Sequence, residues 1–136
     1  MVEEKTGKII LVEDDDHFRL ILRRLIEGRF PLTSIEEARE GNEAMEKIKA
    51  FHPDLIFMDI RLHKENGLVL TKKIKELYPQ AQVIVLTGFD LPEYREAALE
   101  SGASFFASKQ KSSVKDILEF VDTALSAGKL SPAGPS

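Results

Sequence analysis

The sequence has no cysteine among its 136 residues, which excludes disulfide bonds and thiolate metal sites. A chain without disulfides suits a reducing compartment, so we expect a cytoplasmic protein. No apolar run approaches the roughly 18 residues of a membrane span, and residues 1–5 lack the apolar core of a signal peptide. Basic runs are also absent and the formal net charge is −4, so we expect neither membrane insertion nor direct nucleic-acid binding by this segment.

Short apolar strands alternate with amphipathic helices along the chain. The strands are expected at residues 9–12, 32–35, 55–58, 83–86 and 103–107, each followed by a helix. Five such strand–helix units predict an α/β fold built on a doubly wound parallel sheet. One domain is expected over residues 8–127. Residues 128–136, rich in Pro, Gly and Ser, are expected to form a flexible tail or the stub of a linker.

The starts of three helices carry capping signals. Asp90 with Glu93 predicts a capping box at the fourth helix, and Ser113 with Asp116 predicts one at the last. The acids at residues 15–16 are interpreted as ordinary first-turn residues of the first helix, where Asp caps backbone amides and favours the helix dipole.

Polar side chains follow four of the five expected strands. Glu13 and Asp14 come after the first strand, Asp59 after the third, Thr87 after the fourth and Lys109 shortly after the fifth. In open α/β sheets the carboxyl ends of the strands form the ligand-binding edge. Carboxylates gathered there repel one another unless a cation lies among them, and Mg²⁺ is the simplest candidate.

The same edge suits phosphoryl chemistry. A hydroxyl from Thr87 and an ammonium from Lys109 match the charged oxygens of a phosphoryl group. Asp59 can attack phosphorus and form an aspartyl-phosphate, with catalysis mainly by positioning and charge neutralisation.

These residues resemble the receiver domain of two-component response regulators, and the resemblance covers Lys8 to about Leu125. Four segments carry it, in order and at matching spacing: the strand and acidic pair at residues 9–15; the phosphoacceptor motif at residues 53–59, with Gly67 eight residues on; the switch strand at residues 85–88; and Gly102-Ala103, Phe106 and Lys109. The fold it implies is flavodoxin-like, with strand order 2-1-3-4-5.

The resemblance also implies a Mg²⁺ site. Asp14 would be a direct ligand, Glu13 a ligand acting mainly through water, and Arg61 would contribute its backbone carbonyl. Asp59 would be both a ligand and the phosphorylation site.

The resemblance also implies how the domain would respond to phosphorylation. Thr87 and Lys109 would contact the phosphoryl group, and Thr87 and Phe106 would rearrange with it. The expected donor is a sensor histidine kinase or a phosphotransfer protein, and the expected output is an effector domain, a downstream protein or a phosphorylation-dependent dimer. The chain would then be a single-domain regulator or the front of a longer protein, with its cognate kinase and effector unidentified.

Departures from the family pattern leave one alternative interpretation open. His63 and Gln110 stand where prolines are usual, which raises the hypothesis of a pseudo-receiver, an interaction module that works without phosphate. The peptide bond before Gln110 is expected to be trans. A hydrolase acting on a separate substrate would need an acid where Arg61 stands, so we expect no enzyme beyond self-phosphorylation and slow dephosphorylation. Arg61 and Phe89 are both large and are expected to crowd the attacking water.

Overall fold

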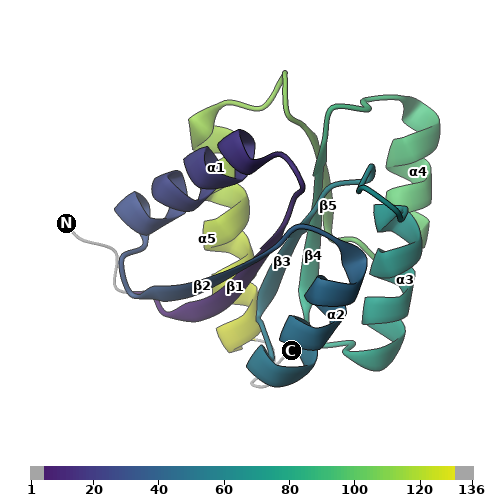
Figure 1. Cartoon of the computed structure of the whole chain (residues 1–136). Helices are drawn as coiled ribbons and strands as arrows, with labels where there is room; N and C mark the ends of the chain where they lie inside the picture. The colour runs from purple at the N-terminus through teal and green to yellow at the C-terminus, as the bar shows by residue number, and fades with distance from the viewer. Residues whose placement is uncertain (1–4, 131–136) are drawn as a thin grey trace.

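The computed structural model of the chain describes residues 5–130, which form alternating strands and helices (Figure 1). The elements are β1 (Gly7–Val12), α1 (Asp16–Arg29), β2 (Thr33–Ala38), α2 (Gly41–Phe51), β3 (Leu55–Met58), α3 (Gly67–Leu77), β4 (Gln82–Thr87), α4 (Pro92–Glu100), β5 (Phe105–Ser108) and α5 (Val114–Leu130). The strands pair in parallel in the order β2-β1-β3-β4-β5. The predicted doubly wound sheet and its flavodoxin-like order are therefore confirmed.

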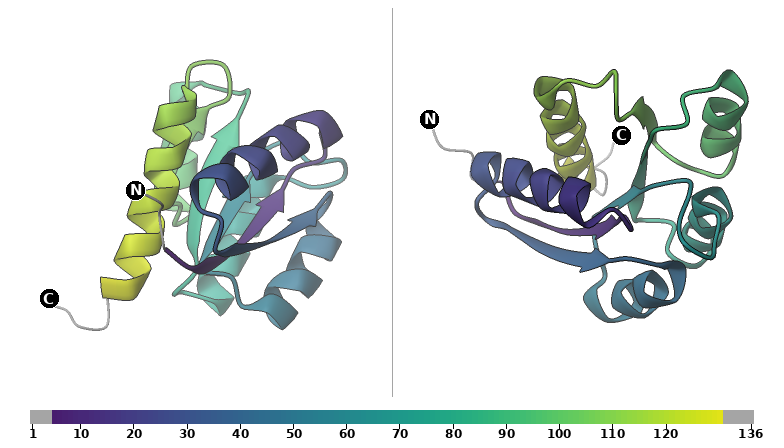
Figure 2. Two further views of the ribbon diagram at one scale, coloured as in Figure 1. Left: turned by 90° about the vertical axis from the view of Figure 1, so that its left-hand side faces the viewer. Right: turned by 45° about the horizontal axis from the view of Figure 1, so that its top comes forward.

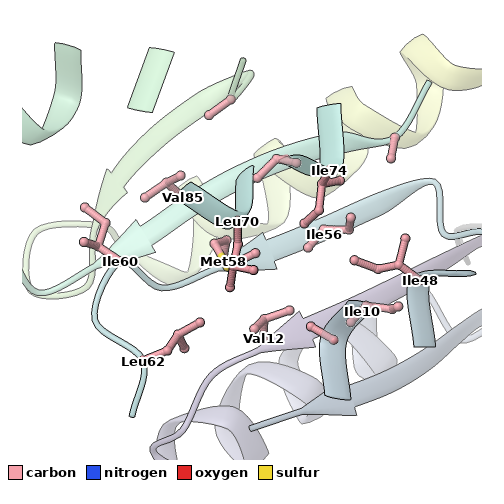
Figure 3. Packing of buried hydrophobic residues seen from close by; sticks show 14 of the residues in the cluster. Ile10, Val12, Ile48, Ile56, Met58, Ile60, Leu62, Leu70, Ile74 and Val85 are labelled. Carbon is pink, nitrogen blue, oxygen red and sulfur yellow. The ribbon is translucent and has the colours of Figure 1, made fainter. Parts of the chain in front are cut away.

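Helices cover both faces of this sheet (Figure 2). Along β1, Ile9 and Leu11 pack toward α1 and α5, whereas Ile10 and Val12 pack toward α2, α3 and α4. Successive strand residues point to opposite faces, so a strand buried on both sides must be apolar at every position. Figure 3 shows the larger cluster, in which strand residues such as Met58 meet helix residues of α2 and α3.

The strand β2 extends further than the sequence predicted. It was expected at residues 32–35 and runs over Thr33–Ala38. Two glutamates hid the second half of the strand, since acids are rare in strand interiors. Glu37 is compatible with the strand because it lies at the sheet edge and bonds Arg19 and Arg23 of α1, each at 2.6 Å.

One of the two predicted capping boxes is confirmed. Ser113 and Asp116 exchange backbone-to-side-chain hydrogen bonds of 3.0 Å at the start of α5. The box predicted at Asp90 is wrong, because Leu91 occupies the N-cap of α4 and makes no side-chain cap. Asp90 instead pairs with Lys111 at 3.0 Å, in the loop that follows β5.

The domain limit expected at residue 127 falls inside α5, which continues to Leu130. Residues 131–136 of the expected tail lie outside the described residues. None of the helices within residues 5–130 combines the length and apolarity needed to cross a bilayer.

Gly67, at the start of α3, packs closely against the backbone of Asp59 and Ile60 in the loop after β3. A Cβ added there would lie 1.9 Å from the carbonyl oxygen of Asp59, and the Gly67 N–H donates a 2.6 Å hydrogen bond to Ile60. Gly67→Ala should therefore lower the free energy of unfolding by about 1–3 kcal/mol, measured by urea denaturation.

Gly28→Ala is the matched control, since a Cβ at Gly28 meets nothing within 4 Å. This variant should be more stable than the wild type by about 0.5–1 kcal/mol, because alanine favours the helix. Equal stability of the two alanine variants would show that the loop yields to the added methyl group.

Candidate functional site

The central strands bring the predicted acids together at one edge of the sheet. Val12 pairs with Met58 in the β1–β3 register, so the residues that follow them, Glu13 and Asp59, leave the sheet side by side. The Asp59 N–H donates to the Val12 carbonyl at 3.2 Å, which continues the ladder by one residue. The exposed fractions of Glu13 and Asp59 are 4% and 7%.

Three carboxylates converge at this edge. One oxygen each of Glu13, Asp14 and Asp59 lies within 4.8 Å of the others. Oδ1 of Asp59 is buried and makes no hydrogen bond to any residue that the structure describes. A buried carboxylate oxygen without a partner is costly, and a hard divalent cation among three carboxylates would satisfy it. The side chains present therefore fit such a metal ion.

Lys109 compensates part of this negative charge. Its Nζ lies 2.7 Å from Oε1 of Glu13 and 3.1 Å from Oδ2 of Asp59. Burial opposes the charged ammonium, but the two carboxylates outweigh burial, so the pKa of Lys109 is raised. Burial raises the pKa of Glu13 to about 7, and the nearby Asp59 adds to that shift while the Lys109 hydrogen bond opposes it. One ammonium therefore leaves the cluster short of positive charge.

Thr87 ends β4 and is fully buried. Its Oγ1 accepts a 3.3 Å hydrogen bond from the Phe89 N–H, and its carbonyl accepts a 2.8 Å bond from the Lys109 N–H. The Thr87 backbone thus ties the loop that bears Lys109 to the end of the neighbouring strand.

The two phenylalanines of β5 lie on opposite faces of the sheet, as strand alternation predicts. Phe106 is buried in the cluster beneath α2, α3 and α4, and the Arg95 guanidinium carbon lies 4.9 Å from its ring centroid. Phe105 is half-buried and packs on Phe120 of α5, with ring centroids 5.0 Å apart.

The Arg61 side chain lies over the ring of Phe89. Its guanidinium carbon lies 4.5 Å from the centroid of the Phe89 ring, and its backbone bridges to Asn66. Arg61, Phe89 and Tyr94 help line a cavity of about 180 Å³ between the loops that follow β3 and β4. The residues expected to crowd an attacking water are therefore in contact with each other.

Gln110 does not prevent Lys109 from reaching the acids. The Lys109–Gln110 peptide bond is trans, as expected. Sequence reasoning missed what orders this loop, the hydroxyl of Ser108, which accepts hydrogen bonds of 3.2 Å from the N–H groups of Gln110 and Lys111. A serine directly before a loop is the available signal, since such hydroxyls often cap local turns.

Phe18 is a second contact that the sequence did not reveal. It lies in the first turn of α1, and its ring centroid lies 4.5 Å from the Lys109 Nζ. Asp15 is the N-cap of α1, as interpreted from the sequence, and accepts the N–H groups of His17 and Phe18 at 3.0 and 3.1 Å. The bond from Phe18 is the main reason that the pKa of Asp15 is lowered.

Comparison with known proteins agrees with this arrangement. LnrK, a transcriptional regulatory protein of Bacillus subtilis, is 39% identical over 125 residues, which are 92% of this chain and 56% of LnrK. The chemotaxis protein CheY of Halobacterium salinarum is 35% identical over 86% of this chain and 98% of its own length. A CheY-like receiver domain from Methanospirillum hungatei superposes with a TM-score of 0.84 at 25% identity, covering 97% of this chain and all of that one.

A LuxR-family response regulator from Aurantimonas superposes with a TM-score of 0.83 at 28% identity, over 90% of this chain and 86% of that one. The family model for the response regulator receiver domain matches residues 9–122. The sheet order, the acidic edge and these matches agree, and the chain belongs to the family of receiver domains of two-component response regulators.

Proposed function

We propose that Asp59 accepts a phosphoryl group from the phosphohistidine of a sensor histidine kinase or of a phosphotransfer protein. The observation that carries the proposal is the Asp59 carboxylate itself. One of its oxygens contacts Lys109, and the other is buried without a hydrogen-bond partner among the described residues, beside Glu13 and Asp14. A carboxylate so arranged has a free lone pair and a source of charge compensation next to it.

The proposed step is a displacement at phosphorus. A carboxylate oxygen of Asp59 forms the new bond, and the bond to the donor's imidazole nitrogen breaks with its electron pair remaining on nitrogen. The Lys109 ammonium neutralises charge on the transferred group, and the Thr87 hydroxyl donates to it. Neither residue needs to move a proton, so positioning accounts for most of their contribution.

Glu13, Asp14 and Asp59, with the backbone carbonyl of Arg61, are the residues that we propose to hold Mg²⁺. When bound, the ion supplies the positive charge that Lys109 alone does not, and it neutralises oxygens of the phosphoryl group. The raised pKa of Glu13 supports this assignment, because it indicates a carboxylate whose charge is incompletely compensated.

The output that we propose is a change in packing on the side of α4, β5 and α5. Thr87 and Phe106 are the switch residues, since Thr87 ends β4 and Phe106 is buried next to Arg95 of α4. Phosphorylation can shift this equilibrium only by its differential affinity for the two states. The receiver unit is taken as residues 8–127 of a cytoplasmic protein, and its effector is an attached domain, a downstream protein or a second copy.

The pseudo-receiver alternative is less well supported. It rests on His63 and Gln110, and both side chains are exposed. Lys109 still reaches Asp59 at 3.1 Å with glutamine next to it, so the substitution does not remove the group that compensates the phosphoryl charge.

The direct test of the phosphorylation site is Asp59→Asn. An amide is a much poorer nucleophile than a carboxylate, so labelling by acetyl phosphate with magnesium should fall to background, measured by intact-protein mass spectrometry. Asp54→Asn, at the opposite end of β3, is the control and should be labelled like the wild type. Labelling of Asp59→Asn at the wild-type level would assign the phosphoryl group to another residue.

If the acidic cluster binds magnesium, the ion should stabilise the folded protein. Magnesium chloride should raise the free energy of unfolding by about 2.7 kcal/mol at a hundredfold excess over its dissociation constant, measured by urea denaturation. Sodium chloride of equal ionic strength controls for screening, and Asp14→Asn should abolish most of the gain because it removes one of the three carboxylates. A magnesium effect no larger than that of the sodium salt would contradict the site.

The contact between Arg61 and Phe89 predicts a long-lived phosphoryl group. The double variant Arg61→Ala, Phe89→Ala should lose its phosphoryl group severalfold faster than the wild type, because we propose that this pair, which is in contact beside the cavity, crowds the attacking water. The decay is followed by mass spectrometry after removal of the phosphodonor. Lys64→Ala, in the same loop and exposed, should leave the decay unchanged. Equal decay of the double variant and the wild type would refute the covering role.

A further inference from the structure

The Lys109 ammonium is held from three sides. Two are the carboxylates of Glu13 and Asp59, at 2.7 and 3.1 Å. The third is the face of the Phe18 ring, whose centroid lies 4.5 Å from Nζ. An ammonium within about 6 Å of a ring centroid is attracted by the negative face of the ring, and the attraction grows when the pair is removed from water.

Of these three contacts, the ring is the one that does not depend on a formal charge. The proposed reaction changes both of the others, since Asp59 becomes an acyl phosphate and Glu13 is assigned to the metal site. A neutral ring retains its attraction for the ammonium throughout. It also cannot compete with the carboxylates for the metal, because an aromatic ring offers no oxygen ligand.

Two kinds of contact hold the Phe18 ring in position. Its backbone N–H donates to the Asp15 side chain at 3.1 Å in the first turn of α1, only five residues after Glu13. Its side chain packs against the hydrophobic cluster between the sheet and the helices α1 and α5. The ring is therefore anchored both by a helix cap and by apolar packing.

The loop that carries Lys109 does less to fix the position of its side chain. The residue after it is Gln110, which is exposed, and the loop is ordered by hydrogen bonds of 3.2 Å to the Ser108 hydroxyl. Nothing in those bonds directs the long side chain of Lys109, which has many rotamers to lose on being held in one place.

From this geometry we propose that Phe18 is a positioning residue for phosphorylation: its ring face holds the Lys109 ammonium in place beside Asp59. The inference rests on the proposed function, because it concerns the lysine that compensates the phosphoryl charge. Phe18 offers neither a metal ligand nor a charge for the phosphoryl group, and its proposed role is exerted through Lys109.

The test compares phosphorylation rates with acetyl phosphate and magnesium in four proteins: the wild type, Phe18→Leu, Lys109→Gln and the double variant. Leucine keeps apolar bulk but removes the ring, so Phe18→Leu should slow labelling by about threefold to thirtyfold. In the Lys109→Gln background the same substitution should have no further effect, because the ammonium is already gone. A merely structural role would slow both backgrounds by the same factor, and that result would overturn the inference.

Two further variants separate the ring from general packing. Phe18→Tyr keeps the ring face and should restore the rate to within about twofold of the wild type. Phe105→Leu removes a ring that is also half-buried and packs against the same hydrophobic cluster, but that ring stacks on Phe120, so its rate should equal that of the wild type. Equal slowing by Phe105→Leu and Phe18→Leu would overturn the inference.

A measurement on the wild type keeps the test independent of variant folding. Nuclear Overhauser effects should connect the Phe18 ring protons with the ε-methylene protons of Lys109, and their absence would contradict the contact. The two proposals fail differently. If Asp59→Asn is labelled as well as the wild type, the proposed function fails; if the wild type is labelled on Asp59 but Phe18→Leu is labelled at the same rate, only the role of Phe18 fails.

Discussion

The interaction on which the rest of this structure depends is the meeting of buried carboxylates with a single ammonium at the carboxyl edge of the sheet. Glu13 and Asp59 face Lys109 from adjacent central strands, and Asp14 completes the acidic cluster. Isolated buried charges are strongly disfavoured, so the arrangement is tolerable only with close compensation. The sheet order β2-β1-β3-β4-β5 allows this compensation. The acids follow the central strands β1 and β3, and the loop that bears Lys109 follows the outer strand β5.

The negative charge of the carboxylates at this edge is incompletely compensated, and the proposed function depends on this property. The pKa of Glu13 is raised to about 7 by burial despite the lysine at 2.7 Å, and one oxygen of Asp59 lacks a hydrogen-bond partner among the described residues. Such an arrangement fits a divalent cation, and we propose that a phosphoryl group on Asp59 would change its balance of charge. The Lys109 N–H donates to the Thr87 carbonyl, so the loop after β5 is joined to the end of β4.

Much of this could be predicted from the sequence, because parallel strands buried on both faces are recognisable as apolar runs. The end of each such run then indicates which polar residues share the edge. Prediction failed where the determining contact is tertiary. Glu37 helped to conceal the second half of β2 because its partners, Arg19 and Arg23, lie on α1. Asp90 looked like a cap, although it pairs with Lys111 in the loop after β5. The contact between Phe18 and Lys109 joins residues 91 positions apart and leaves no local pattern.

The central claim is that Asp59 is the group that becomes phosphorylated. Treating the protein with acetyl phosphate and magnesium, reducing the product with borohydride and mapping the peptides by tandem mass spectrometry tests it directly. Borohydride reduces an acyl phosphate to an alcohol, so the account predicts a homoserine residue at position 59. Reduction at another acidic residue, or phosphate found on a hydroxyl side chain with position 59 intact, would contradict it.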